Sequence, residues 1–268
     1  MLIEKIFPQK SELYVSLNSI FIKIGSKIDK LGLIQLFSLW TLTVAGIVLK
    51  MGVNDRYVYW EWNNWMTGLG KLLFVTLVFV FFLNPNKIWN IDSKRLSMNS
   101  IGIHMVIALM CLLFGHSWPS LNYFIYLLPY LLAFYSGLLI FQFQIQLNIE
   151  KKTWVSLDWE NKSYILFTSF LSMLISVIIG IYLDDPILST SAMVSIPFPL
   201  IALLWPNHVR HLQRARFYPL FIFTMFLCVR APWFLIPLII LFIFLRAVNY
   251  FRFGITHPSF GVDFTEEK

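Results

Sequence analysis

Eight apolar stretches run through this chain, and most of its charged residues lie in the segments between them. A helix of about 20 residues, with a usual range of ~17–25, crosses the apolar core of a bilayer. Hydrophobic residues make up 58% of the 268 positions and charged ones only 13%, which is more apolar surface than one soluble core would bury. We therefore predict an all-α polytopic transmembrane helical bundle of about eight spans, within a range of seven to nine. The spans are expected at 31–49, 69–83, 101–114, 121–143, 164–182, 188–205, 217–229 and 233–248.

The last two predicted spans are separated only by Arg230, Ala231 and Pro232, so they form either a hairpin or one long broken helix. Three parts are expected along the chain. Residues 1–30 interleave apolar residues with lysines, which is typical of an amphipathic helix on the inner membrane surface. Residues 31–250 form the transmembrane domain, and residues 251–268 form a cytoplasmic tail.

Basic residues alternate between the connecting segments in a way that orients the predicted bundle. The acidic pair Asp184–Asp185 lies between spans 5 and 6 and predicts a helix boundary before Pro186, while the connection between spans 3 and 4 has no formal charge. Because cytoplasmic loops carry an excess of lysine and arginine, we expect both termini and the basic connections on the cytoplasmic side. The lack of an N-terminal targeting peptide favours the bacterial inner membrane. The basic connections hold Lys87, Lys94 and Arg95; Lys151, Lys152 and Lys162; and Arg210, Arg214 and Arg216.

The net charge of +7 does not indicate nucleic-acid binding, because the cations lie beside apolar spans, where membrane lipid accounts for them. Cys111 and Cys228 lie inside spans and have neither disulfide nor metal-site spacing. Ionisable residues are almost absent from the spans, which disfavours ion-coupled transport and favours an apolar substrate. The main exception is His104, which we expect to form an interhelical hydrogen bond rather than to bind haem.

The connection between spans 2 and 3 is the first of two polar segments that could bind a ligand. Its single carboxylate, Asp92, is a weak magnesium ligand, because that ion is usually held by one or two carboxylates together with phosphate oxygens. A solvated loop is an equally strong interpretation. The polar and basic residues of this segment are Asn84, Asn86, Lys87, Asn90, Asp92, Lys94 and Arg95.

The connection between spans 6 and 7 is the second polar segment that could bind a ligand. His208 and His211 have a spacing that can bind zinc on a helix, but no third ligand is near and three arginines oppose a cation. Two interpretations remain: an anchor against lipid headgroups, or a pocket in which Arg210, Arg214 and Arg216 hold a diphosphate by charge-assisted hydrogen bonds. A third polar run, residues 142–148, alternates every two residues, and we interpret it as the end of span 4 entering the interface.

This layout resembles the UbiA superfamily of intramembrane prenyltransferases. Residues 36–42 and 250–260 are similar to outlying members, and the resemblance covers most of the chain in layout but only these patches in sequence. It implies a bundle of eight or nine spans that holds a prenyl diphosphate through magnesium, on aspartate-rich motifs in the 2–3 and 6–7 connections. This chain departs from both motifs: the first retains only Asp92, and the second has no aspartate.

Two functional hypotheses follow. The first is a UbiA-like protein that binds an isoprenoid or lipid diphosphate in a membrane cavity, as a prenyltransferase or as a relative that has lost catalysis. The second is a non-enzymatic transporter, lipid-handling protein or subunit of a membrane complex. The first requires that the two polar connections meet over one pocket. Its predicted ligand-binding residues are Asn84, Asn90, Asp92, Lys94, Arg95, His208, Arg210, His211, Arg214 and Arg216.

Overall fold

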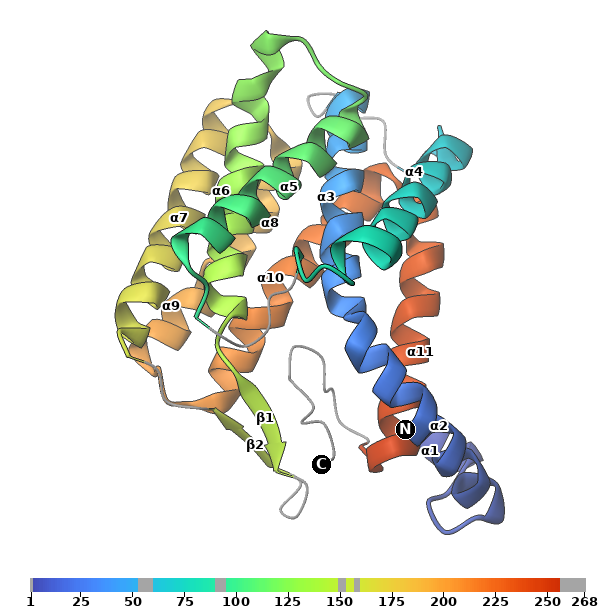
Figure 1. The fold of residues 1–268 in the computed structure, drawn as a ribbon. Coiled ribbons are helices and arrows are strands. Elements are labelled where there is room, and N and C mark those ends of the chain that lie inside the picture. The colour runs from blue at the N-terminus through green and yellow to red at the C-terminus, as the bar shows by residue number, and fades with distance from the viewer. Residues whose placement is uncertain (1, 53–59, 90–94, 149–152, 157–159, 256–268) are drawn as a thin grey trace.

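The computed structural model describes residues 2–52, 60–89, 95–148, 153–156 and 160–255, and they form a helical bundle (Figure 1). In this part of the chain seven helical segments are long and apolar enough to cross a membrane, which makes the chain a polytopic helical membrane protein. These segments are α3 (Leu33–Met51), α4 (Trp65–Val78) with η1 (Phe79–Leu83), α5 (Met98–His116), η2 (Leu121–Tyr123) with α6 (Phe124–Phe141), α7 (Lys162–Tyr182), α8 (Pro186–Ser195) with α9 (Pro197–Leu204), and η3 (Pro232–Phe234) with α11 (Leu235–Phe253).

The seventh predicted span, 217–229, lies within α10 (Val209–Arg230), which is long enough to cross but carries three arginines near its start. The sequence placed Arg210, Arg214 and Arg216 in a loop, and this assignment is wrong because the helix begins about two turns before the apolar stretch. Helices α10 and α11 are two separate helices that meet near η3, not one broken helix (Figure 1).

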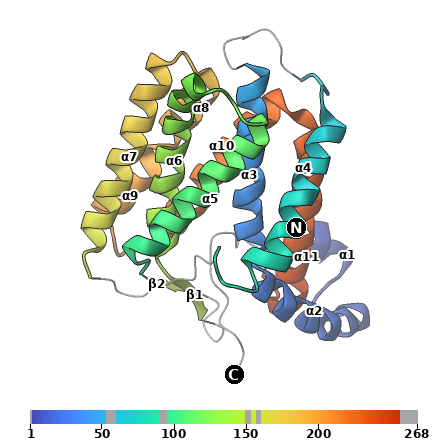
Figure 2. The same cartoon turned by 45° about the horizontal axis from the view of Figure 1, so that its top comes forward.

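The described connections fall at two opposite ends of the bundle, in the order that the charge pattern predicts. We call one of them the basic end: it holds α1 (Leu2–Ile6), α2 (Glu12–Leu31), residues 84–89 and 95–97, and the start of α10 (Figures 1 and 2). Two hydrogen bonds join parts of this end, from the Asn84 side chain to the Lys30 carbonyl at 3.2 Å and from the Leu96 amide to Gln142 Oε1 at 3.2 Å. The assignment of the basic end to the cytoplasm stays a prediction.

Lysine and arginine side chains at the opposite end bind helix carbonyls. The ammonium of Lys71, inside α4, donates to the Phe114 carbonyl at 2.9 Å and also to the Gly115 carbonyl. The guanidinium of Arg230 donates to the Gly52 carbonyl. Cations at a helix C-terminus satisfy carbonyls that have no partner within the helix and complement its dipole. Lys71 therefore has a structural role, although the sequence analysis did not count it among ionisable residues of the spans.

A β-hairpin replaces the predicted end of span 4. Helix α6 ends at Phe141, and β1 (Ile145–Asn148) pairs antiparallel with β2 (Thr153–Ser156) at the basic end. The interpretation of this run as a helix end is wrong, because alternation every two residues is the period of a strand. Ile145 is buried and its neighbour Gln146 is partly exposed, as expected for that period.

Small residues hold two helix pairs close together. A side chain added at Gly46 of α3 would have its Cβ 2.1 Å from the Leu112 carbonyl of α5, and one added at Gly115 would meet the Thr43 carbonyl at 2.1 Å. Backbones approach this closely only where side chains are minimal. On α7, the Ser169 hydroxyl likewise donates to a carbonyl of α6, at 2.9 Å. These contacts form the rigid frame of the bundle.

Asp185 forms the predicted helix boundary before Pro186. It is the N-cap of α8, and its Oδ1 accepts from the amides of Ile187 at 3.1 Å and Leu188 at 3.0 Å. The hydroxyl of Tyr130 on α6 donates to Oδ2 at 2.6 Å. This carboxylate is therefore fully engaged in ordering the turn between α7 and α8.

The predicted amphipathic N-terminal segment is helical. Helix α2 packs on the last turns of α11: the Asn18 side chain donates to the Phe251 carbonyl at 2.6 Å, and the Phe21 and Phe251 rings stack at 4.9 Å. The other apolar edge of α2, with Leu13 and Ile20, is exposed. Contact of this edge with a membrane surface stays a prediction, and of the predicted tail, residues 256–268 lie outside the described part of the chain.

Candidate functional site

Helix α10 separates two cavities. Residues three or four apart share one face of a helix, so the residues of α10 divide into two stripes. One stripe lines a lateral groove between α10 and α11, and the other lines a narrow cavity inside the bundle. The groove stripe includes Arg210, Arg214, Phe217, Phe221 and Met225, and the stripe of the central cavity consists of Arg216, Pro219, Leu220 and Phe223.

The lateral groove has a volume of about 580 Å³. It exists because α10 and α11 meet near η3 and diverge toward the basic end (Figure 1). Phe242 of α11 lies across it from α10, with its ring centroid 5.6 Å from that of Phe221. From Arg210 to Met225 the helix rises about 22 Å. The other residues that line the groove are Trp154 of β2, Gln213, Tyr218, Leu235, Leu238, Ile239 and Ile243.

Positive charge is concentrated at the basic end of the groove. Arg210 and Arg214 are both exposed and lie one helical turn apart, where like charges repel each other. An anion bound between them would relieve this repulsion and accept charge-assisted hydrogen bonds from both. The arrangement is therefore suited to an anionic group whose apolar remainder extends along the groove.

The rings of His208 and His211 pack against each other at a tilt, close to these arginines. The ring centroids of His208 and His211 are 4.1 Å apart, and Trp205 packs on His211 at 5.9 Å. Partial burial, together with the neighbouring positive groups of His208 and Arg214, lowers the pKa of His211. The neutral form of His211 is thus favoured until an anion binds nearby.

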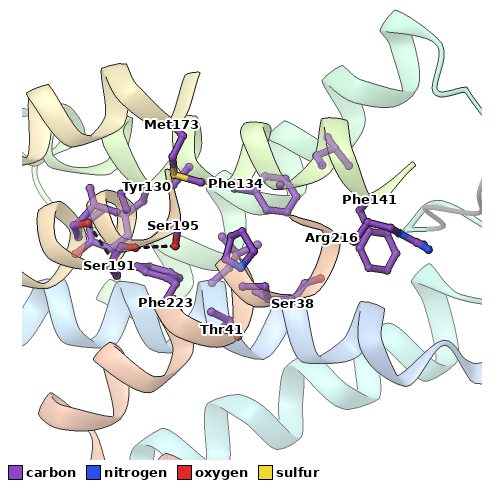
Figure 3. Close-up of a pocket in the computed structure, with 18 of the residues that line it drawn as sticks. Ser38, Thr41, Tyr130, Phe134, Phe141, Met173, Ser191, Ser195, Arg216 and Phe223 are labelled. Carbon is purple, nitrogen blue, oxygen red and sulfur yellow. Dashed lines mark hydrogen bonds between the residues drawn. The ribbon is translucent and has the colours of Figure 1, made fainter. Parts of the chain in front are cut away.

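The central cavity is narrow, with a volume of about 90 Å³, and five helices contribute to its wall: α3, α6, α7, α8 and α10 (Figure 3). Arg216 lies at its basic end, with a side chain that is 2% exposed and a guanidinium 4.6 Å from the centroid of the Phe141 ring. Hydroxyl groups of Ser38, Thr41 and Ser195 also face the cavity.

These hydroxyls leave the cavity largely apolar. Ser38 donates to the Gln35 carbonyl at 2.7 Å, Thr41 to the Phe37 carbonyl at 2.9 Å, and Ser195 to the Ser191 carbonyl at 2.7 Å. Because each donor is already used within its own helix, a ligand finds hydrogen-bond acceptors on this wall rather than donors. Among the residues that line this cavity, only Arg216 carries a charge.

The structure divides the predicted ligand residues between several places. Only Arg210 and Arg214 line the groove together, since Arg216 faces the central cavity and the two histidines stand beside the groove. Asn84 binds the end of α2, and Arg95 is exposed before α5. The predicted residues Asn90, Asp92 and Lys94 lie outside the described part of the chain. The described residues contain no cluster of three His, Cys, Asp or Glu side chains that could bind a metal ion.

Trp89 is the residue through which the 2–3 connection reaches a cavity, and the sequence analysis did not identify it. Its side chain is fully buried, its indole donates to the Gln35 carbonyl at 3.2 Å, and its ring stacks on Phe134 at 5.6 Å. Gln35 and Phe134 both line the central cavity. A tryptophan next to an asparagine-rich turn resembles any interfacial anchor, so its position in the sequence did not indicate burial.

His104 does not make the predicted interhelical hydrogen bond. Its Nδ1 donates to the Ser100 carbonyl of the same helix at 2.7 Å, and its ring packs on Trp89 at 4.9 Å. The prediction is wrong because a histidine can bond the carbonyl four residues earlier in its own helix, as serine and threonine do. His104 thus supports the position of Trp89.

Comparison of the chain with protein-family models, with curated proteins and with solved structures found no match in any of the three.

Proposed function

We propose that this membrane protein binds an isoprenoid or lipid diphosphate in the groove between α10 and α11. The diphosphate lies between Arg210 and Arg214, and the apolar chain extends toward η3. One observation carries this proposal: two arginines one turn apart stand at the end of a long groove whose other lining residues are mostly apolar.

Both parts of such a ligand contribute to its affinity. A hydrogen bond to a charged group contributes about 1.5–3 kcal/mol, and each buried methylene contributes about 0.8 kcal/mol. The apolar lining includes Phe217, Phe221 and Phe242, whose rings can cover the chain on both sides. An isoprenoid alcohol lacks the charge and inorganic diphosphate lacks the chain, so each should bind more weakly than the complete ligand.

Kinship with the UbiA superfamily is part of this proposal, with binding retained and metal-assisted transfer lost. Ionisation of an allylic diphosphate in that family depends on magnesium held by carboxylates, and no acidic residue is among those that line the groove. We accordingly place the protein in the lipid-handling class rather than among transferases.

The proposal is tested by measuring equilibrium binding of farnesyl diphosphate, farnesol and inorganic diphosphate to the full chain in lipid nanodiscs. The double variant Arg210→Ala/Arg214→Ala should weaken binding of farnesyl diphosphate by at least about 100-fold, because two charged hydrogen-bond partners are lost. The matched control is Lys87→Ala/Arg95→Ala, which removes the same charge from exposed residues at the same end. Equal weakening in both double variants would mean non-specific attraction and would overturn the proposal.

A further inference from the structure

We infer that the N-terminal arm, formed by α1 and α2, sets the width of the groove between α10 and α11. The arm packs on the end of α11 at the basic end, where the two groove helices diverge (Figures 1 and 2). The residues of the arm contact α11 and are not among those that line the groove, so they are positioning residues. The inference rests on the proposed function only where it concerns ligand binding, because the position of α11 can be measured without a ligand.

Side chains of the arm cap the C-terminus of α11. The last carbonyls of a helix have no hydrogen-bond partner within that helix, and groups from elsewhere must satisfy them. The Asn18 side chain donates to the Phe251 carbonyl at 2.6 Å, and the Gln9 side chain donates to the Gly254 carbonyl at 2.9 Å. The end of α11 is therefore bound by polar groups from a segment more than 230 positions away in the chain.

An ion pair fixes the same end of α11 to the later part of α2. The Arg252 guanidinium donates to the Asp29 carboxylate. The side chain of Arg252 passes over Gly25, where an added Cβ would lie 2.8 Å from Arg252 Cδ. A glycine at position 25 thus leaves the space that the arginine occupies between the two helices.

The arm is itself fixed to the frame of the bundle. Gly32 joins α2 to α3 without a loop, and the Asn84 side chain donates to the Lys30 carbonyl at 3.2 Å. Helix α3 belongs to the close contact with α5 that Gly46 permits. The position of the frame is therefore transmitted through α2 to the end of α11.

The ring of Phe242 is the second support of α11 along the groove. It packs on Phe221 of α10 at 5.6 Å and on Phe37 of α3 at 5.3 Å. Beyond this ring α11 diverges from α10, and its last turns pack on the arm instead (Figure 1). Without the arm, the end of α11 would pivot about Phe242 and the groove would lose its fixed width.

The experiment measures the distance between α10 and α11 by double electron–electron resonance on the full chain in lipid nanodiscs, without a ligand. Nitroxide labels are attached at Asn207→Cys, just before α10, and at Phe244→Cys on α11, since both residues are exposed and neither lines the groove. The native Cys111 and Cys228 are replaced by alanine. This background should give one narrow distance distribution.

The double variant Gln9→Leu/Asn18→Leu removes both amide donors of the cap. We expect the α10–α11 distance distribution to become at least about twofold wider, because the end of α11 gains freedom of movement. Binding of farnesyl diphosphate should weaken about tenfold or more, because the ligand must then order the groove. The matched control is Ser16→Leu/Ser19→Leu on the exposed face of α2, which should keep the wild-type distances and binding.

Gly25→Leu tests the arm by a different route, since it leaves both amides in place and fills the space of the Arg252 side chain. It should widen the same distribution, and Ser26→Leu, at the next and exposed position, should not. A second label pair at Val106→Cys on α5 and Ile178→Cys on α7 should report unchanged distances in every variant, because the frame stays folded.

The inference is overturned if both arm variants keep the wild-type width, or if the serine controls widen the distribution as much as the arm variants do. It is also overturned if the α5–α7 distances change together with the α10–α11 distances, because the arm would then support the whole bundle rather than the groove. A wild type that does not bind farnesyl diphosphate would refute the proposed function alone, since the distance measurements decide about the arm without a ligand.

Discussion

Helix pairs α3–α5 and α10–α11 represent two opposite ways of packing in this bundle. The first pair brings Gly46 and Gly115 into backbone contact, whereas the second meets at η3 and leaves a groove of about 580 Å³. Small residues allow the first contact, and large aromatic residues such as Phe221 and Phe242 hold the second pair apart. The comparison teaches that side-chain size decides which helix pairs form the frame and which form a site.

The largest expected effect is on the frame. Gly46→Val places a Cβ 2.1 Å from the Leu112 carbonyl, so α3 and α5 must separate. We expect a loss of about 3 kcal/mol or more in the free energy of unfolding, at the upper end for overpacked sites. Unfolding of the variant in detergent measures this loss. Gly102→Val, where no atom lies near the added Cβ, should change stability far less, and equal losses would contradict the close contact between α3 and α5.

The groove should tolerate a large residue that the frame would not. Ile239→Trp fills part of the groove from α11, where the side chain is already exposed, so we expect a stability change below about 1 kcal/mol. Binding of farnesyl diphosphate should nevertheless weaken about tenfold or more, because the chain loses its space. Ile240→Trp changes the next residue, which is also exposed but does not line the groove, and this variant should bind farnesyl diphosphate normally. A binding defect in both variants would count against the groove.

The smallest expected effect is a pH dependence of anion binding. Burial and nearby positive groups lower the pKa of His211 below the usual value of about 6.5. The ring is therefore neutral at neutral pH and gains its charge only as the pH falls below that usual value. A bound anion favours the protonated ring and raises its pKa. Binding of farnesyl diphosphate should therefore tighten a few-fold as pH falls from neutral toward about 5.5. Titrations of wild type and His211→Gln measure this, and an equally steep pH dependence in the variant would exclude His211 as its source.

The positions of the crossings could be predicted from the sequence because each depends on a local signal. Apolar length places a helix in lipid, and the alternation of lysine and arginine assigns successive connections to opposite ends. The start of α10 was missed because Arg210, Arg214 and Arg216 look like a loop when judged by charge alone. Once the segment is known to be helical, the 3.6-residue period separates Arg216 from the other two.

The pairing of helices could not be predicted, because it depends on contacts between residues far apart in the chain. Nothing local at Gly46 indicates that it faces Gly115, and nothing local at Trp89 indicates that it lies behind Phe134. The β-hairpin was missed for a different reason. Its two-residue alternation was visible at residues 142–148, but the preceding span favoured the continuation of a helix.

Gly32 joins helix α2 directly to helix α3, with no loop between them. This glycine is both the C-cap of α2 and the N-cap of α3, and its backbone has a left-handed conformation with φ 65° and ψ 57°. An inserted residue therefore cannot be accommodated by a loop between the two helices. One extra residue within the last turn of α2 would rotate everything before it by about 100° and move Asn18 and Phe21 off Phe251. The helical phase of some twenty upstream residues is thus set at a single glycine.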